Sequence, residues 1–402
     1  MTAPTQEAAA GPANGAAPKG DAPPVVYRPF RIGAQEVDDD VYDEVATLTA
    51  GSVTMPQYNI PSTAFLRAIY MLVENTVTGN TATATGTGAV GVLEADGPYN
   101  VIDSFSLTDT NSSEIIGPVT GYDLYIINKW GGYLFNDDAE ANTDLFTSTS
   151  NATASSSAAG SFSFILRIPL ELVPRDALGA LPNKSASTPF KIKMRLAAID
   201  TVFITSTTVG GSCRVRMMPD SYWEPTPTDG SGNPIASLPP GVNTTQYWNV
   251  STYERTAGNF TVPLVNSVGY PVRNLGFRLG DATDVRATGE TDWPDPFKLQ
   301  MQSNVIINRL KKIWKRKISE WYSYHAAGDA AGQKDNGIYW QPYCGDFTHK
   351  PGWETRRGYL RTTDGMRLEG KGSIGGTGTH KLTVYTNYVG VGKGSTLAQL
   401  TT

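Results

Sequence analysis

Apolar and polar residues alternate along several segments of the chain, and this alternation predicts β-strands. In residues 162–172 every second residue is apolar: Phe162, Phe164, Leu166, Ile168, Leu170 and Leu172. Residues 190–196 show the same period, with Lys and Arg on the opposite face. One apolar and one charged face predict strands of an antiparallel sheet that is buried on one side. Residues 65–73 are apolar on both faces, which predicts a strand in the middle of a sandwich.

Strand patterns continue in the second half of the chain, at residues 246–254, 260–265, 273–279, 336–344, 366–374 and 380–389. Two segments have a helical period instead. In residues 121–133, Leu124 and Ile127 recur at helical spacing, and Gly131 and Gly132 would then end the helix. The sequence therefore predicts an all-β protein with two inserted helices.

The second predicted helix covers residues 303–325 and is the strongest charge feature of the chain. Its apolar residues follow an i, i+3, i+4 pattern: Ile306, Leu310, Ile313, Trp314, Ile318, Trp321 and Tyr322. Its basic residues are Arg309, Lys311, Lys312, Lys315, Arg316 and Lys317. Long basic side chains cover apolar surface while their charges stay in water, which favours packing or a contact between subunits. A contact with membrane or nucleic-acid phosphates is the alternative.

The order of elements repeats along the chain. In each half, strands lead to an acidic turn, then to a single helix, then to further strands, as in a duplicated domain. Pro and Gly are concentrated between the halves, which predicts a linker. The predicted division is a flexible N-terminal arm over residues 1–54, a first β domain over 55–223, a Pro/Gly-rich linker over 224–242, a second β domain over 243–392 and a flexible C-terminal tail over 393–402.

Composition and charge narrow the picture further. The 402 residues include 41 Gly and 26 Pro, which disfavours helical bundles. The net charge is −5 and its acidic excess lies in the first 54 residues, so the remainder is close to neutral. A neutral body lacks the basic footprint of a dedicated nucleic-acid-binding protein. Cys213 and Cys344 are too few for a disulfide framework or a structural zinc site, and we expect buried or free thiols.

No group of residues in the sequence points to catalysis. The three histidines, His325, His349 and His380, lack the spacing of a metal site, and we expect them on the surface or in loops. The segment VGVGKGST resembles a phosphate loop, but Gly394 follows Lys393 where that loop needs Ser or Thr. Aspartates in turns are explained by local capping of amides. We therefore expect a protein that is not an enzyme and that has no cofactor and no metal.

Two stretches resemble the double jelly-roll major capsid proteins of tectivirus-like bacteriophages. NVIDSFSLTDTNSSEIIGPVTGYDLYIINKWGGY at 100–133 is similar to their first barrel, in which a strand, an acidic turn, a Gly-Pro and a short helix ending in Gly-Gly-Tyr follow one another. WPDPFKLQMQSNVIINRLKKIWKRKISEW at 293–321, with the segments 336–360 and 380–389, is similar to the second barrel. The resemblance covers roughly residues 55–390.

This resemblance implies two tandem eight-stranded jelly rolls, each with a helix in one connection. It implies a major capsid protein that self-assembles as pseudo-hexagonal trimers and tiles an icosahedral shell. The implied partners are further copies of the chain, a penton or vertex protein, minor capsid proteins and an internal membrane, with no specific nucleic acid. The implied location is the virion capsid, assembled in the host cytoplasm.

The alternative is a two-domain jelly-roll phage protein that binds carbohydrate or a receptor. Such a protein would use exposed aromatic residues such as Tyr339, Trp340 and Trp353 to stack on sugar faces. A glycoside hydrolase on a β-sandwich is a third reading, but nothing in the sequence picks out an acid and a base.

Overall fold

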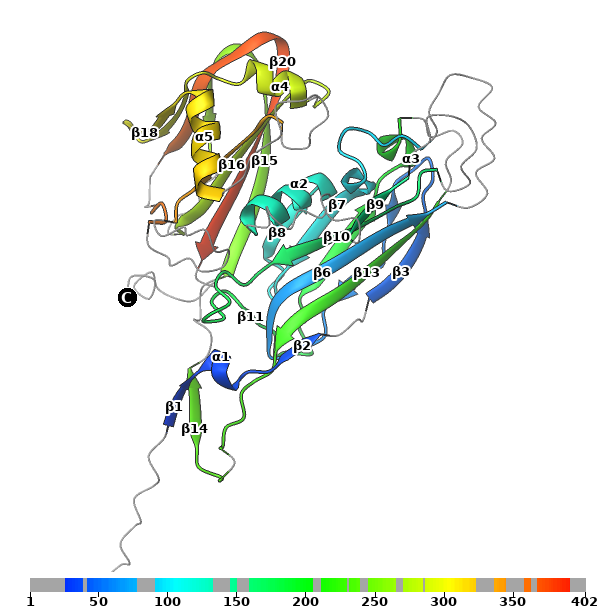
Figure 1. The fold of residues 1–402 in the computed structure, drawn as a ribbon, viewed down its shortest axis with the longest axis vertical. Coiled ribbons are helices and arrows are strands. Elements are labelled where there is room, and N and C mark those ends of the chain that lie inside the picture. The colour runs from blue at the N-terminus through cyan, green and yellow to red at the C-terminus, as the bar shows by residue number, and fades with distance from the viewer. Residues whose placement is uncertain are drawn as a thin grey trace, which may run out of the picture.

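The computed structural model has two β-rich halves that stand side by side (Figure 1). We refer to residues 26–222 as the first half and to residues 245–390 as the second half. The structure describes residues 26–38, 42–77, 91–132, 145–149, 159–204, 211–229, 231–238, 245–264, 270–284, 286–322, 336–344, 358–362 and 367–390.

A seven-stranded sheet forms one face of the first half. Its order is β2-β13-β6-β10-β9, with β3 also on β13 and β11 also on β6. The strands are β2 (Glu36–Asp38), β3 (Tyr42–Thr47), β6 (Phe65–Thr76), β9 (Phe146–Ser148), β10 (Phe162–Pro169), β11 (Leu181–Pro182) and β13 (Ser212–Tyr222). The alternation predicted for β10 is confirmed, because Phe162, Phe164 and Leu166 are buried. One face of this sheet therefore packs against an apolar core.

An eleven-stranded sheet runs through both halves, in the order β18-β17-β20-β15-β8-β7-β12-β4. Strand β5 also pairs with β12, and β16 pairs with β19 and β20. From the first half come β4 (Val53–Thr54), β5 (Tyr58–Asn59), β7 (Ile102–Thr108), β8 (Glu114–Val119) and β12 (Lys191–Leu196). From the second come β15 (Thr245–Pro263), β16 (Val272–Asp281), β17 (Phe297–Met301), β18 (Asn304–Arg309), β19 (Ile338–Pro342) and β20 (Leu368–Gly390). The halves join where Trp248 of β15 pairs in parallel with Ile116 of β8.

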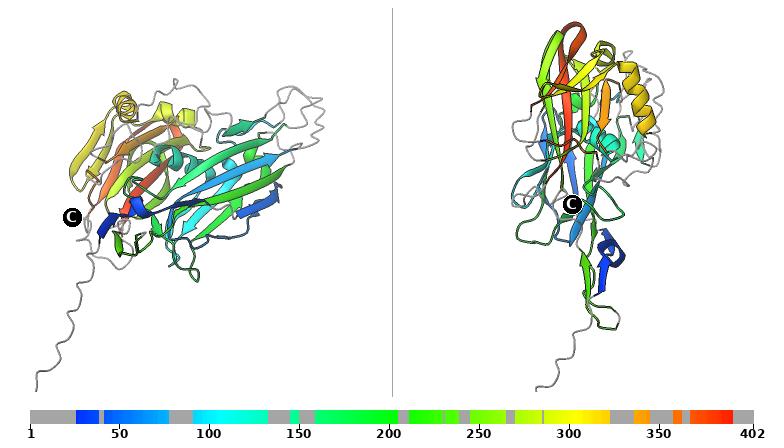
Figure 2. Two further views of the ribbon diagram at one scale, coloured as in Figure 1. Left: turned by 60° about the horizontal axis from the view of Figure 1, so that its bottom comes forward. Right: turned by 90° about the vertical axis from the view of Figure 1, so that its left-hand side faces the viewer.

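The helices are short and lie in connections between strands. They are α1 (Phe30–Gly33), η1 (Tyr99–Val101), α2 (Gly121–Ile126) with the π-helical turn η2 (Ile127–Gly131), α3 (Ile199–Val202), α4 (Arg286–Asp292) and α5 (Lys311–Tyr322). The helix predicted over 121–133 is confirmed as α2 and η2. Helix α2 lies between the two halves, whereas α5 lies on an outer side of the second half, away from that contact (Figures 1 and 2).

One apolar core extends through both halves. Buried side chains from β6, β10 and α2 belong to the same cluster as those of β16, β17 and α5. Both cysteines are buried, as expected. His380 is buried, contrary to the expectation of a surface position, because its ring nitrogen Nε2 bonds Asp292 Oδ2 at 3.0 Å. His325 and His349 lie outside the described residues.

Two pairs of predicted strands are in fact single long strands. Residues 246–254 and 260–263 belong to β15, and residues 368–374 and 380–389 belong to β20. The ladder between β15 and β20 shifts register between Thr256 and Gly258 and then continues. Gly258 has a φ of 109°, a backbone conformation that is costly for residues with a side chain. The two segments predicted as separate strands are therefore one strand with a bulge near Gly258.

The predicted helix over residues 303–325 is wrong at its start. Residues 304–309 form β18, which pairs antiparallel with β17, and α5 begins only at Lys311. Ile307 pairs with Leu299 and Val305 with Gln300, which leaves Ile306 as the extra residue of a bulge. Pairing with another strand has overridden the local helical period. Residues 323–325 lie outside the described part.

The predicted arm and linker also contain paired strands. Strands β2 and β3 extend the sheet beyond β13, so the described part of residues 1–54 is not a free arm. Within the predicted linker, β14 (Ile235–Leu238) pairs in parallel with β1 (Val26–Pro29), and this ribbon projects at the lower end of the molecule (Figure 1). These pairings join residues that are distant in sequence, so a local pattern does not indicate them. Residues 1–25 and 393–402 lie outside the described residues.

A charged cluster anchors the N-terminal segment to the base of the first half. The guanidinium of Arg67 lies 3.0 Å from Glu171 Oε2, 3.2 Å from Glu36 Oε1 and 3.6 Å from Asp220 Oδ2. Beside it, the ring of Phe30 packs edge-on against that of Phe65, with centroids 4.9 Å apart. Burial raises the pKa of Asp220 to about 6, although Arg67 acts in the opposite direction.

This raised pKa predicts that stability falls as pH rises from about 4 to about 6. Over that range the folded chain retains the proton of Asp220 whereas the unfolded chain releases it. The expected loss in the free energy of unfolding is about 2 kcal/mol. Denaturant titrations at pH 4 and pH 7 would measure it, and Asp220→Asn should remove this part of the pH dependence. An unchanged difference between the two pH values in the variant would contradict the assignment to Asp220.

Candidate functional site

Helix α2 begins with side-chain hydrogen bonds that place a carboxylate between the two halves. The hydroxyl of Thr120 accepts a hydrogen bond from the amide of Asp123 at 3.2 Å. In return, Asp123 Oδ2 accepts from the amide of Thr120 at 3.1 Å, which completes a capping box. Gly121 is required here, because a Cβ would lie 2.0 Å from the carbonyl oxygen of Tyr99. The cap therefore fixes both the first turn and the direction of the Asp123 carboxylate.

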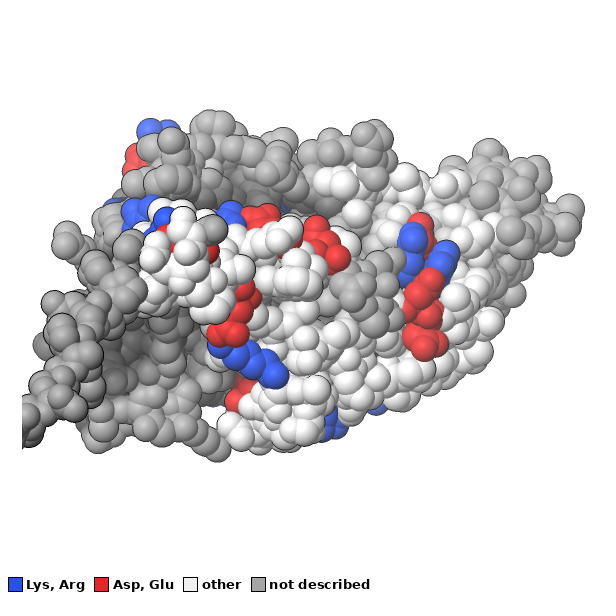
Figure 3. Space-filling model, turned by 90° about the horizontal axis from the view of Figure 1, so that it is seen from below, with Lys and Arg blue, Asp and Glu red and all other residues white. Residues whose placement is uncertain are grey.

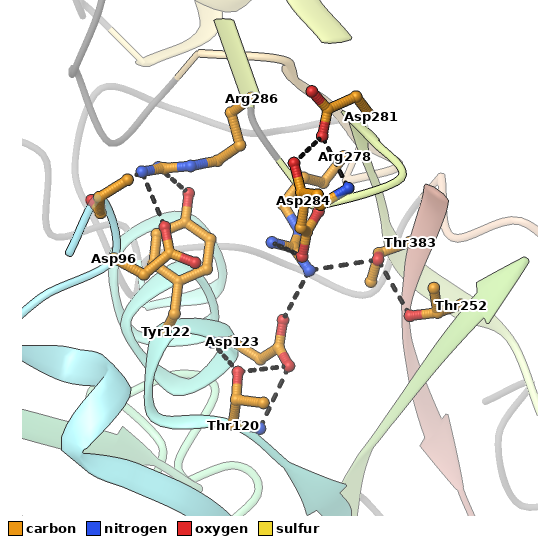
Figure 4. A network of polar contacts seen from close by, with 12 residues as sticks. Asp96, Thr120, Tyr122, Asp123, Thr252, Arg278, Asp281, Asp284, Arg286 and Thr383 are labelled. Carbon is orange, nitrogen blue, oxygen red and sulfur yellow. Dashed lines mark hydrogen bonds and ion pairs between the residues drawn. The ribbon is translucent and has the colours of Figure 1, made fainter. Parts of the chain in front are cut away.

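Asp123 joins this helix to the second half (Figure 4). The hydroxyl of Tyr385, on β20, donates to Asp123 Oδ1 at 2.7 Å. Arg278, on β16, lies 3.9 Å from the same oxygen and 3.0 Å from Asp284 Oδ2. Burial beside these charges raises the pKa of Tyr385 well above its ordinary value, so its hydroxyl stays a donor. One carboxylate thus serves the helix and the facing half together.

A second arginine crosses the same boundary. Arg286, at the start of α4, donates to the hydroxyl of Tyr122 at 2.5 Å and to the carbonyl of Ala95 at 2.9 Å. Its Nη2 lies 2.8 Å from Asp96 Oδ1, and its guanidinium stacks 4.5 Å from the centre of the Tyr122 ring. Burial raises the pKa of Asp96, although Arg286 and Arg278 act in the opposite direction. The charges of the two halves compensate each other where water is excluded.

Tryptophans complete the contact below this network. Trp130 of η2 stacks on Trp340 of β19, with centroids 6.2 Å apart. A Cβ on Gly131 would lie 2.3 Å from the ring of Trp248, so this glycine allows the close approach of β15. Arg273 also donates to the carbonyl of Gly131 at 3.2 Å. Gly131 therefore allows the two halves to pack closely, in addition to its position at the end of the helix.

The arrangement fixes one half against the other. In the described ranges, no three His, Cys, Asp or Glu side chains are grouped so that they could hold a metal ion. The helices of the described part are all too short or too polar to cross a membrane. What the contact does chemically is to hold two β domains as one rigid block through compensated charges and stacked rings.

The six basic residues singled out in the sequence do not form one cluster. Lys311 and Lys315 point inward: Lys311 Nζ donates to the Glu290 carbonyl at 2.9 Å, and Lys315 Nζ lies 3.0 Å from Glu290 Oε2. Arg309 donates to Gln341 at 2.8 Å, and burial lowers its pKa. These three attach β18 and α5 to the second half.

The other three basic residues lie at the surface. Lys312 and Arg316 are exposed, and Arg316 pairs with Glu320 one turn later at 2.9 Å. Lys317 lies 5.7 Å from the centre of the Trp321 ring. Only these three basic groups of α5 remain for a partner.

The apolar face predicted for this segment is only partly buried. Trp314, Ile318 and Tyr322 are buried, as a core face requires. Ile306, Leu310 and Ile313 are instead exposed, and so is Val305. The sequence pattern missed this division because it assigned residues 303–325 to one helix, whereas Val305 and Ile306 belong to the strand β18. An exposed aliphatic surface on an outer flank is therefore a second functional candidate.

The inter-domain contact was not predicted from the sequence. Asp123 and Tyr385 are separated by 262 positions, and neither belongs to a motif of its own. The sole signal was the segment Gly-Pro-Val-Thr-Gly-Tyr-Asp, in which Thr and Asp stand three apart before an apolar run.

Comparison with solved structures decides the fold. The major capsid protein of Sulfolobus Turreted Icosahedral Virus superposes with a TM-score of 0.56 at 14% identity, covering 88% of this chain and 97% of that chain. The chain has the double jelly-roll fold. This double jelly roll is also similar to PBCV-1 VP54, with a TM-score of 0.54 and 12% identity over 91% of this chain and 95% of that chain. No family model and no curated protein matches the sequence.

The predicted all-β fold class with two tandem jelly rolls is thereby confirmed. The comparisons include the PBCV-1 virus capsid, with a TM-score of 0.53 at 11% identity over 91% of this chain and 95% of that chain. The narrower resemblance to tectivirus-like bacteriophages stays a prediction.

Proposed function

We propose that this double jelly-roll protein is a major capsid protein that self-assembles as pseudo-hexagonal trimers and tiles an icosahedral virus shell. The observation that carries the proposal is the likeness to capsid proteins over nearly the whole of both chains. The rigid contact between the halves supports the proposal, because subunits that pack in a regular shell need their two domains held in a fixed orientation. The protein would act through shape and self-association, without catalysis.

The division into a first jelly roll over 55–223 and a second over 243–392 is part of this proposal. Strand β13 ends at Tyr222 and β15 begins at Thr245, which supports a boundary between them. The finer predictions also belong here: assembly in the host cytoplasm, location in the virion capsid, and contacts with a vertex protein, minor capsid proteins and an internal membrane.

The carbohydrate-binding alternative loses its main support. Tyr339 and Trp340, which would have stacked on sugars, are fully buried. Trp340 packs against Trp130, Trp248 and Tyr385. Trp353 lies outside the described residues. Trp340 belongs to the contact between the halves, whereas Tyr339 stacks on Trp293 inside the second half, so neither ring is available to a ligand at the surface.

We expect the purified protein to form trimers at micromolar concentrations, with three times the chain mass of 43.2 kDa. Light scattering coupled to size-exclusion chromatography measures this mass directly. Electron microscopy at higher concentration should then show pseudo-hexagonal particles. A stable monomer at every concentration would contradict the proposal, and a specific hit on a glycan array would favour the alternative.

A further inference from the structure

The outer flank of the second half has an unusual concentration of exposed aliphatic side chains. Val305, Ile306, Leu310 and Ile313 are exposed by 50%, 37%, 48% and 49%. They are four of the eight large exposed hydrophobic residues in the described part of the chain, and they fall within nine consecutive positions. We call this surface the α5 flank. Strand β18, which belongs to it, pairs only with β17 among the described strands, so its other edge is open.

Helix α2 is covered by the other half of the chain, whereas α5 has no such cover in the described residues. All six residues of α2 are buried, because the second half covers the helix with Arg278, Arg286 and Tyr385. In α5 only Trp314, Ile318 and Tyr322 are buried. Both helices lie on the same side of their own half (Figure 1). The second half therefore presents a helix flank that is equivalent to a covered one and that no described segment of this chain covers.

The edge of the first half formed by β2 and β3 has charge of the opposite sign. At its surface, helix α5 has three basic residues, Lys312, Arg316 and Lys317, and the acidic Glu320, which pairs with Arg316, whereas β2 and β3 together contain four acidic and no basic residues. The edge formed by β2 and β3 also exposes Val45 by 58%. Two of these four carboxylates pair within the chain, Asp43 with Arg214 and Glu36 with Arg31 and Arg67. The charge offered to a partner is therefore that of Asp38 and Glu44. Seen from below, basic and acidic side chains lie next to each other in small groups amid mostly uncharged surface (Figure 3).

We propose that the α5 flank of one copy docks on the acidic β2–β3 edge of the first half of a second copy. This inference rests on the proposed function and names the contact through which it operates. The two surfaces lie on different halves of one chain, so the contact is head-to-tail, and three copies form a ring if the rotation between neighbouring copies closes. Each helix flank in the ring is then covered by the next jelly roll, within the chain for α2 and between chains for α5.

A single charge on the α5 flank tests the apolar part of the contact. Ile313→Asp should raise the trimer dissociation constant by roughly 30-fold or more, because it places a carboxylate in the interface. The matched control is Ile204→Asp, which replaces an aliphatic residue that is 62% exposed and lies outside this surface. Sedimentation velocity measures both, and circular dichroism should show that both are folded. Trimers of Ile313→Asp with wild-type affinity would overturn the proposal.

A charge exchange tests the partner. Lys312→Glu and Glu44→Lys should each weaken assembly, and the double variant should recover most of the lost affinity. Recovery supports this pairing of surfaces. Additive losses in the double variant would overturn the assignment of the β2–β3 edge.

Two outcomes separate this inference from the proposed function. If the wild type never assembles, the proposed function is wrong, and the wild-type measurement alone shows this. If the wild type forms trimers that Ile313→Asp leaves intact, the capsid function stands and the α5 flank is the wrong surface. Flotation with vesicles of anionic phospholipid covers the other occupant: vesicle binding that Ile313→Asp abolishes without any effect on trimers would assign the flank to a membrane.

Discussion

Asp123→Ala is expected to lower the free energy of unfolding by about 3 to 4 kcal/mol. The substitution removes the capping box of α2 and the acceptor of the Tyr385 hydroxyl, and it takes one carboxylate from the buried Arg278. Removing one member of a buried network leaves its partners without compensation, which costs more than the loss of a surface pair. Denaturant titration followed by tryptophan fluorescence and circular dichroism measures the loss.

The same titration tests whether the network couples the two halves. We expect one transition in the wild type and two separated transitions in Asp123→Ala, because the halves then unfold with less mutual support. Asp123→Asn keeps a capping oxygen and an acceptor for Tyr385, so its loss should be smaller.

The matched control for Asp123→Ala is Asp176→Ala, which breaks an exposed ion pair with Arg175 at 2.8 Å. The control should lose less than about 1 kcal/mol. Equal losses in the two alanine variants would show that the inter-domain network contributes no more than a surface pair.

Trp314→Ala should be the other most damaging change, with an expected loss of about 3 to 5 kcal/mol in the free energy of unfolding. The ring of Trp314 is fully buried and packs edge-on against Trp293 and Phe277. Its Nε1 donates to the carbonyl of Trp340 at 2.9 Å. Without this side chain α5 loses its main anchor, so limited proteolysis should cut the helix sooner than in the wild type.

Two further variants separate the sources of this loss. Trp314→Phe keeps an aromatic ring in the core and removes the hydrogen bond, so it should cost less than the alanine variant. Trp223→Ala removes a ring that is 55% exposed and should cost less than about 1 kcal/mol. If Trp314→Ala unfolds at the same denaturant concentration as Trp223→Ala, α5 is not held by this residue.

The two sets of variants probe different contacts. Asp123 lies where one half meets the other, and Trp314 lies where α5 meets its own half. Because α5 carries the flank proposed for the second copy, Trp314→Ala should also weaken trimers, whereas Ile313→Asp should do so with little loss of stability. This contrast distinguishes a loss of folding stability from a loss of affinity between copies.

Local patterns were sufficient where one strand face meets the core. The alternation in β10 and β12 identified their buried side chains, since a strand places successive side chains on opposite faces whatever its partners are. Helix α2 was also predicted, because its apolar spacing and its terminal glycines are neighbours in sequence. The resemblance in short phrases correctly indicated the double jelly roll.

Patterns failed where pairing joins distant residues. The apolar residues of 304–309 fit a helix as well as a strand, and only β17 decides between them. Likewise β3 has little apolar character of its own and is held by β13. The exposed positions of Ile306, Leu310 and Ile313 follow from this strand and from the absence of a covering segment in the described chain.

By itself, the sequence determined the β-rich class, the two similar halves, and the burial of alternate side chains in the longer strands. These are consequences of local geometry, in which the period of the backbone matches the period of apolar residues. Only the tertiary structure decided that Asp123, Arg286 and Tyr385 meet, and that α5 turns an apolar flank outward. Such contacts depend on how two domains are oriented, and no short stretch of sequence encodes that orientation.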